Sequence, residues 1–171
     1  MEEYLDIFNV DGDLLGKLTR SECHQEDVGV YHKAVWVWIK NSKNQYLVQK
    51  RSMFKKKSPG KWDMPVAGHV CSGESSILTC VRETQEELGV SVAEKDFVFL
   101  KEWLNQYGWE LAQIYLLKLD IDIKDIKLQQ EEVEAVQWLE YEDFVKLLYS
   151  QEFCEHAIEY KDWIVKRLRD K

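Results

Sequence analysis

Alternating apolar and polar residues predict that much of the chain forms β-strands. Two short strands flank a turn at Asp11–Gly12, and a longer hairpin is expected from residues 32–40 and 45–51. Trp36 and Trp38 are two residues apart in this hairpin and therefore share one face of their strand. Further strands are expected in the segments WDMPVAGHV, FVFLKEWL, WELAQIYLLKL and VEAVQWL.

Residues 75–88 show a helical repeat in place of this alternation. The inward positions recur at i, i+4, i+7 and i+11 of one helix face, and they are Ile77, Val81, Thr84 and Leu88. Gly89 follows, as expected where a left-handed residue ends a helix. Two further helices are expected in EYEDFVKLLYS and FCEHAIEYKDWIVKRLRD. This order of elements favours an α/β protein with α+β or α/β/α layers over a βαβ repeat.

The composition suits one domain spanning residues 1–171, because 45% hydrophobic residues supply a sizeable core. The net charge of -8 makes the chain a poor candidate for binding nucleic acid or a membrane surface. Four cysteines without a CxxC pair indicate free thiols in a reducing cytosol. The acidic start MEEYLDIFNV and the lack of an apolar run of about 20 residues predict a cytoplasmic protein without a signal peptide or membrane span.

One stretch of the chain is strongly basic, although the chain as a whole is acidic. Between Lys40 and Lys61 there are eight Lys or Arg residues and no Asp or Glu. The stretch is a candidate anion site, and a solvated basic loop explains the same charges equally well.

Glu83, Glu86 and Glu87 crowd about one turn near the end of the predicted helix. Like charges at these spacings destabilise a helix by roughly 0.2–0.5 kcal/mol per pair, and the helix dipole disfavours anions at this end. A divalent cation would reverse both penalties, and oxygen-only ligands suit Mg²⁺ or Mn²⁺. A solvated acidic face, with Arg82 paired to Glu86, is the alternative that these residues alone leave open.

The spacing around these glutamates resembles the Nudix box, G-x5-E-x7-R-E-U-x-E-E-x-G-U, in which U is an apolar residue. The segment GHVCSGESSILTCVRETQEELGV, from Gly68 to Val90, matches the pattern apart from Thr84 at the first U. The resemblance implies an α/β/α sandwich with a mixed sheet and a loop-helix-loop metal motif. It also implies a pyrophosphohydrolase that uses Mg²⁺ or Mn²⁺ to cleave a diphosphate linked to another moiety, often a nucleoside.

The resemblance implies roles for individual residues, position by position. Arg82 would orient the glutamates, and Glu74 would help to hold the loop against the helix. Catalysis is assigned to Glu86, Arg82 and Glu83, with Glu86 as the first candidate for the general base. The other candidates for the base are Glu110, Glu131 and Glu132. The implied metal ligands are Glu83, Glu86, Glu87 and the carbonyl of Gly68.

The hairpin that ends in KR, the Lys-rich loop, PGKW and GH follow one another in order, and WELAQIYLLKL and EEVEAVQWL come later. With these motifs the chain resembles, from about residue 4 to residue 150, the isopentenyl-diphosphate isomerase branch of the same superfamily. Arg51 and Lys55 match positions that contact the diphosphate in those isomerases. An arginine fork suits phosphate oxygens, although a plain surface charge is the alternative at both positions. The isomerases also imply a second metal site, whose histidines correspond to His32, to His69 and, with the spacing off by one, to His24.

The chain lacks some of the residues that isomerase chemistry needs. The position of the catalytic cysteine holds Ala67, which has no proton to exchange, whereas Glu110 matches the catalytic glutamate. Gly108 replaces a carboxylate ligand of the isomerase metal site. The complete box therefore favours hydrolysis of a phosphoanhydride in a small diphosphate compound. An isomerase and a non-catalytic nucleotide-binding module are the alternatives. The identity of the substrate, the number of metals and the oligomeric state, including a homodimer, remain open.

Overall fold

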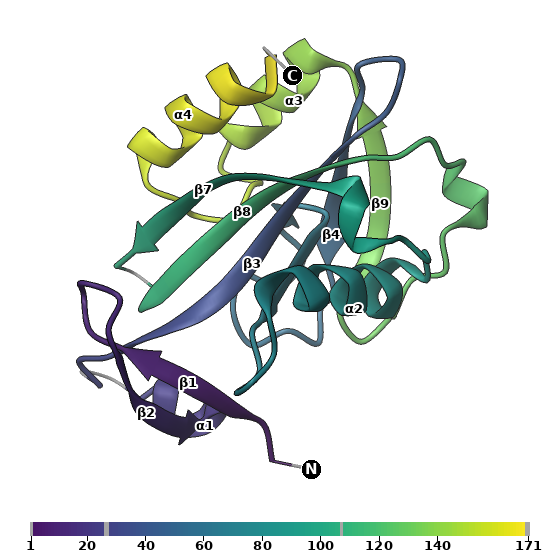
Figure 1. Cartoon of the computed structure of the whole chain (residues 1–171). Helices are drawn as coiled ribbons and strands as arrows, with labels where there is room; N and C mark the ends of the chain where they lie inside the picture. Colours follow the sequence, from purple (N-terminus) through teal and green to yellow (C-terminus); the bar gives the residue numbers. More distant parts are fainter. Residues whose placement is uncertain (1, 26–27, 107, 170–171) are drawn as a thin grey trace.

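The computed structural model describes residues 2–25, 28–106 and 108–169. In this part of the chain a nine-stranded mixed sheet lies between helices on both faces (Figure 1). α2 (Ser76–Leu88) covers one face, whereas α3 (Tyr141–Leu148) and α4 (Ile158–Arg169) cover the other. The expected α/β/α sandwich is confirmed.

The strands follow the predicted segments closely, except that WDMPVAGHV forms two strands rather than one. In chain order they are β1 (Tyr4–Phe8), β2 (Leu14–Thr19), β3 (Tyr31–Lys40), β4 (Tyr46–Arg51), β5 (Trp62–Asp63), β6 (Val66–His69), β7 (Phe97–Asn105), β8 (Glu110–Lys118) and β9 (Val133–Leu139). The short helical segments are α1 (Arg20–Cys23), η1 (Glu94–Asp96) and η2 (Ile123–Asp125).

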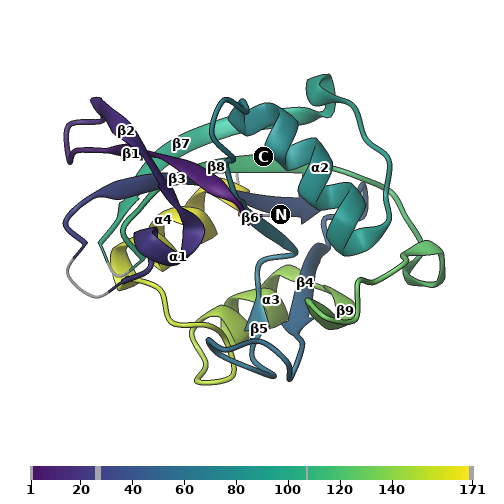
Figure 2. The ribbon, with the colours of Figure 1, turned by 90° about the horizontal axis from the view of Figure 1, so that it is seen from below.

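The predicted β3–β4 hairpin is paired only beside its turn, at Ile39 with Leu47 and at Lys40 with Tyr46. Beyond these pairs β3 joins the parallel strand β8 and the antiparallel strand β6, while β4 joins β5 and β9. The sheet therefore forks, with β6 beside β3 and β5 beside β4 (Figure 2). The loop that leads from β6 into α2 lies against β1, because Cys71 pairs with Leu5 and the Ser72 amide donates to the Tyr4 carbonyl at 2.7 Å.

The predicted C-terminal cap of α2 is confirmed, because Gly89 ends the helix with a φ of 68°. At the other end Ser75 is the N-cap rather than a helical residue, and its side chain accepts a hydrogen bond from the Leu78 amide at 3.4 Å. Thr84 is fully buried, and its hydroxyl donates to the Cys80 carbonyl at 2.6 Å. Thr84 occupies a position that is apolar in the box, and this hydrogen bond gives its buried hydroxyl a partner.

The last predicted helix begins later than expected. Residues 153–157 precede α4, because this segment pairs its backbone with Trp62: the Trp62 amide donates to the Glu152 carbonyl and the Cys154 amide donates to the Trp62 carbonyl, both at 2.8 Å. Asp170, the last residue of the predicted helix, lies outside the described residues.

Lys40, the first residue of the basic stretch, is buried rather than solvated. Its Nζ donates to the Leu168 carbonyl at 3.4 Å, beside the Tyr46 hydroxyl, which donates to the same carbonyl at 3.0 Å. The cation thus supports the C-terminal end of α4, where the helix dipole favours positive charge. Among the described residues, every helix is too short or too polar to cross a membrane.

Candidate active site

Arg82 ties α2 to the loop that follows β6. Its guanidinium donates two hydrogen bonds of 3.1 Å to the carboxylate of Glu74, through Nε and Nη2. Nη1 donates to Glu83 Oε1 at 2.7 Å and to Glu86 Oε2 at 3.1 Å. Nη2 also donates to the His69 carbonyl at 3.2 Å. One arginine therefore orients three carboxylates and the backbone beside them.

Gly68 allows the Glu83 side chain of α2 to lie directly against β6. A Cβ atom at this position would lie 2.1 Å from both Cδ and Oε1 of Glu83. Only a residue without a side chain lets the Glu83 carboxylate rest against the backbone of β6. The first glycine of the box is thus required by packing against a candidate ligand.

Burial disfavours negative charge on two of the three clustered glutamates. Burial raises the pKa of Glu83 to about 7, even though Arg82 opposes the shift. Burial, followed by the charge of Glu83, raises the pKa of Glu87 well above its ordinary range. The like-charge penalty inferred from the sequence contributes to these shifts, but burial, which the sequence spacing did not predict, is the larger cause.

The donor set fits a hard divalent cation. The three carboxylates and the Gly68 backbone supply oxygen only, which suits Mg²⁺ or Mn²⁺ better than a metal that prefers sulfur or nitrogen. Because Glu83 lies against Gly68, a carboxylate and the backbone of β6 are close together at the candidate cation site.

Replacing Glu87 with Gln should stabilise the protein in the absence of metal. A raised folded-state pKa means that the ionised carboxylate destabilises the fold, so the cost is absent below the ordinary pKa of 4.5 and grows as the pH rises above it. We expect Glu87→Gln to unfold a few degrees higher at pH 7.5, since 1 kcal/mol corresponds to about 2–4 °C in a chain of this size. Thermal unfolding in EDTA measures this difference.

The gain from Glu87→Gln should disappear at pH 4, where the wild-type carboxyl is protonated. Adding Mn²⁺ at pH 7.5 should reverse the order of stability, because the variant lacks one ligand charge. A variant that is no more stable than wild type in EDTA would contradict the buried-charge argument.

Arg51 and Lys55, the predicted diphosphate-binding residues, already have carboxylate partners. Arg51 Nη1 pairs with Asp63 Oδ2 at 3.1 Å, and its guanidinium also donates to the Lys57 carbonyl at 3.1 and 3.2 Å. Lys55 Nζ forms an ion pair with Glu132. Asp63 carries no spacing signal in the sequence, and its partnership with Arg51 arises from the pairing of β4 with β5.

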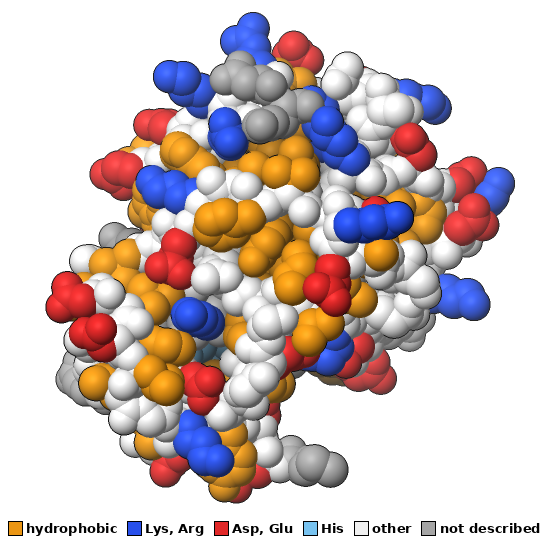
Figure 3. All heavy atoms as spheres, viewed as in Figure 1, with side chains coloured by type: hydrophobic (Ala, Val, Ile, Leu, Met, Phe, Trp, Pro, Cys, Tyr) orange, Lys and Arg blue, Asp and Glu red, His pale blue; other side chains and the backbone are white. Residues whose placement is uncertain are grey.

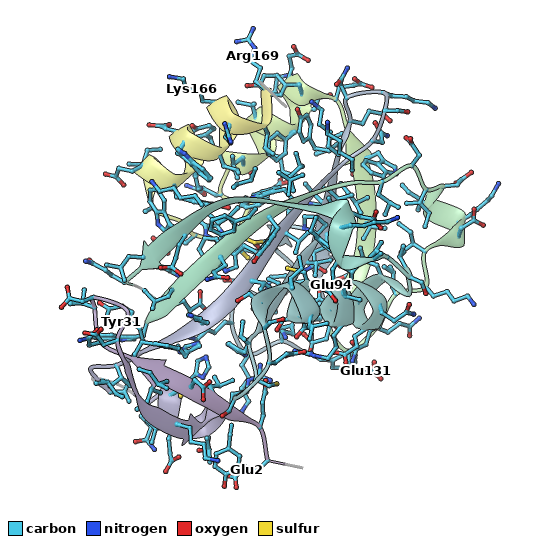
Figure 4. The ribbon with its side chains drawn as sticks, in the orientation of Figure 1. Glu2, Tyr31, Glu94, Glu131, Lys166 and Arg169 are labelled. Carbon is cyan, nitrogen blue, oxygen red and sulfur yellow. The ribbon has the colours of Figure 1, made fainter. Side chains whose placement is uncertain are left out.

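The candidates for the general base differ in their surroundings. The Glu86 side chain is 50% exposed and bonds to Arg82, so it can reach solvent and substrate. Glu132 is held by Lys55 close to Glu87, while Glu131 is exposed at the surface beside the end of α2 (Figure 4). Glu110 lies on a different strand and accepts a 3.0 Å hydrogen bond from Asn105.

Three histidines meet at one place, and one of them, His69, belongs to the box segment. His24, which follows α1, His32 of β3 and His69 of β6 bring their ligand nitrogens within 4.8 Å of one another. His32 is fully buried, and its two ring nitrogens find no hydrogen-bond partner within the described chain. Burial, followed by neighbouring positive charge, lowers the pKa of His32 to about 4 and that of His69 to about 2. Figure 3 shows histidine at the floor of a hollow beside the β1–β2 hairpin.

Imidazole nitrogens gathered in this way are potential ligands for a transition metal. The Nδ1 atom of His24 donates to the Arg20 carbonyl at 2.7 Å, so the tautomer leaves Nε2 free to coordinate. The sequence spacing placed His24 one residue off, and the fold brings it into the group. Gly108, in contrast, contributes no side chain near Glu110.

Comparison with known proteins decides the family. A family model described as "NUDIX domain" matches residues 30–159. The chain belongs to the NUDIX domain family. Relatives named as Nudix hydrolases support a Nudix pyrophosphohydrolase, and the family generally uses divalent metal ions.

Three relatives illustrate what this Nudix chain is similar to. Nudix hydrolase 3 of Arabidopsis thaliana is 37% identical over 163 residues, covering 88% of this chain but only 21% of the plant protein. An isopentenyl-diphosphate Delta-isomerase of Escherichia coli is 33% identical over 97 residues, or 57% of this chain and 53% of the isomerase. The DR0079 crystal structure from Deinococcus radiodurans superposes with a TM-score of 0.77 at 21% identity, over 97% of this chain and 99% of that one.

Proposed function

We propose that this Nudix chain hydrolyses a phosphoanhydride bond in a small diphosphate compound with the help of Mg²⁺ or Mn²⁺. The observation that carries the proposal is the Glu83 carboxylate resting against Gly68, with Glu86 and Glu87 beside it and Arg82 binding two of the three. Residues 1–171 would act as a single domain in the cytoplasm, without nucleic-acid or membrane partners.

Glu83, Glu86, Glu87 and the Gly68 carbonyl would hold the cation. When bound, the cation neutralises diphosphate oxygens and lowers the pKa of water. Arg82 keeps Glu83 and Glu86 in position through its two Nη1 hydrogen bonds. Glu86, the most exposed of the clustered carboxylates, accepts the proton of the attacking water.

Arg51 and Lys55 would bind the diphosphate oxygens. Both cations contact carboxylates, Asp63 and Glu132, and the charge of Lys55 also acts on the candidate ligand Glu87. A diphosphate offers more negative charge than one carboxylate, so it competes well for Lys55, whose partner is partly exposed.

Hydrolysis should depend on both the metal and a diphosphate bond. The direct test is to incubate the protein with ADP-ribose, diadenosine tetraphosphate, nucleotide sugars and prenyl diphosphates, with Mg²⁺, Mn²⁺ or EDTA, and to follow the products by chromatography. We expect cation-dependent cleavage of at least one compound. No cleavage of any of them would favour the non-catalytic nucleotide-binding module.

The competing isomerase function has a separate test. Ala67 occupies the cysteine position, so the chain should not exchange protons of isopentenyl diphosphate in deuterated water. Deuterium incorporation at a rate that depends on Glu110 would support the isomerase instead.

His24, His32 and His69 would hold a second ion of the transition series. In a titration with Co²⁺, visible absorption should rise until one ion is bound per chain, and this absorption should be absent in His32→Gln. His156→Gln is the matched control, because His156 is the fourth histidine of the chain and lies outside the group. Equal Co²⁺ binding by both variants would exclude this site.

A further inference from the structure

Gln49 is a buried polar residue at a position of β4 where an apolar residue is expected. Leu47 and Gln49 are two residues apart and therefore share the strand face that α2 covers, where Leu47 is fully buried in the core. Gln49 itself is only 4% exposed. A buried amide costs free energy unless its donor and acceptor groups are hydrogen-bonded. The partners of this side chain therefore indicate why a polar residue stands here.

The amide of Gln49 reaches the candidate cation ligand Glu87. Its Nε2 donates a hydrogen bond to Glu87 Oε2 at 3.4 Å. This contact joins β4 to the last turn of α2, so it holds the carboxylate from the side of the sheet. Arg82 holds Glu83 and Glu86 from the helix itself. Gln49 thus gives the third glutamate of the cluster a side-chain contact of its own.

The oxygen of the same amide has no partner. Gln49 Oε1 is buried, and no group among the described residues donates a hydrogen bond to it. A metal ligand must be deprotonated, and an ionised carboxylate only accepts, so Nε2 has to face Glu87 when a cation is bound. Oε1 is bonded to the same carbon as Nε2, so this free acceptor lies close to the Glu87 carboxylate. It is available to a donor that enters the site.

Strand pairing limits the directions in which the side chain can turn. Gln49 lies opposite Asp63 of β5 and opposite Val136 of β9, so β4 has a neighbouring strand on both sides at this residue. Side chains stand roughly perpendicular to such a sheet, which directs Gln49 towards α2. Along β4 it lies between the core residue Leu47 and Arg51, the proposed diphosphate-binding arginine. The amide is therefore fixed at the edge of the candidate site.

We infer that Gln49 is a positioning residue of the cation site: Nε2 holds the Glu87 carboxylate, and Oε1 accepts a hydrogen bond from a water molecule that enters with the cation. Mg²⁺ gives up water reluctantly and usually keeps several water molecules when a protein binds it. Buried water needs about three hydrogen-bonding partners, and Oε1 supplies an acceptor for it. The inference rests on the proposed function, because it assigns a role at the cation site proposed there.

The Mn²⁺ affinity of matched variants tests this role without substrate. Gln49→Met keeps the length of the side chain but removes both hydrogen-bonding groups. Its dissociation constant for Mn²⁺, measured by calorimetry, should rise at least about tenfold, as expected when a residue that orients a metal ligand is lost. Gln45→Met is the control, because Gln45 also donates to a glutamate, Glu140, at 2.7 Å but lies beside the β3–β4 turn. Its Mn²⁺ affinity should stay within about twofold of wild type.

A double-mutant cycle shows whether Gln49 acts through Glu87. In a chain that already carries Glu87→Gln, Gln49→Met should weaken Mn²⁺ binding by no more than about threefold, because the contact no longer orients a charged ligand. The same loss from Gln49→Met in the wild-type chain and in the Glu87→Gln chain would overturn the positioning role.

Stability without metal separates positioning from a merely structural role. Gln49→Met removes one long hydrogen bond together with one unpartnered buried acceptor. These two effects oppose each other, so the Tm in EDTA should lie within about 4 °C of the wild-type value. A larger fall, or a variant that does not fold, would show that the amide supports the fold itself and would overturn the inference.

Hydrolysis distinguishes failure of the inference from failure of the proposed function. In Gln49→Met the Mn²⁺ concentration that gives half the maximal rate should rise about tenfold, with the rate at saturating Mn²⁺ within about threefold of wild type. Cleavage with an unchanged cation requirement in Gln49→Met would sink the role of Gln49 and leave the proposed function intact. Mn²⁺ binding that depends on Gln49, without cleavage of any diphosphate, would keep the role of Gln49 and remove the hydrolase.

Discussion

Glu86→Gln should reduce hydrolysis of the best diphosphate substrate by at least about 100-fold. The variant keeps the size of the side chain and one oxygen for Arg82, but it removes the group proposed to accept the proton of water, a role worth about 10²–10⁴ in rate. Initial rates at saturating Mg²⁺ measure the loss as kcat.

An exposed glutamate just beyond the box provides the control for this substitution. Glu94 lies on η1, beside α2 (Figure 4), and the ion pairs of Arg82 are with Glu74, Glu83 and Glu86, so Glu94→Gln should retain the wild-type rate. A wild-type rate in Glu86→Gln would remove Glu86 as base or essential ligand. Glu132→Gln would then be the next variant, because Lys55 holds Glu132 close to Glu87.

Gly68→Ala should abolish most of the cation response without unfolding the protein. The added Cβ would overlap the Glu83 carboxyl at 2.1 Å, and the flexible end of that side chain would move rather than the strand. Displacing the ligand Glu83 should weaken Mn²⁺ binding by at least about 100-fold. This is the upper end of the loss in metal affinity seen when a residue that orients a metal ligand is mutated. Calorimetric titration with Mn²⁺ measures the affinity, and activity should fall with it.

The neighbouring residue of the same strand supplies the control for Gly68→Ala. Ala67→Ser also adds one atom to β6, but on the α4 side, so Mn²⁺ affinity should stay within about twofold of wild type. Unchanged Mn²⁺ affinity in Gly68→Ala would show that Glu83 does not contribute to a cation site at this position.

Much of the fold was predictable because its signals are local. The limits of α2 follow from a serine cap, an apolar stripe and a terminal glycine, all within 15 consecutive residues. The strand positions follow from alternation in the same way. The start of α4 was not predictable, because residues 152–154 are drawn into pairing with Trp62, which is about 90 positions away.

The residues of the candidate site were likewise predictable only where they are close together in the sequence. The box glutamates and Arg82 form one continuous segment, so their spacing and helical period already brought them together. The Asp63–His156 contact joins residues 93 positions apart, and the Lys55–Glu132 pair joins residues 77 apart. Neither pairing has a sequence period that could reveal it.

The amino-acid sequence was enough to indicate the family, the helix that gathers the carboxylates and the chemistry those carboxylates favour, because all of these depend on residues close together in one segment. The folded chain was needed to show that β3 and β4 separate into a fork, that His24 reaches His32 and His69 despite its spacing, and that aromatic side chains line a cavity at the end of β7. The physical reason is that strand pairing joins residues distant in the chain, and burial then decides which of their polar groups stay charged, paired or available.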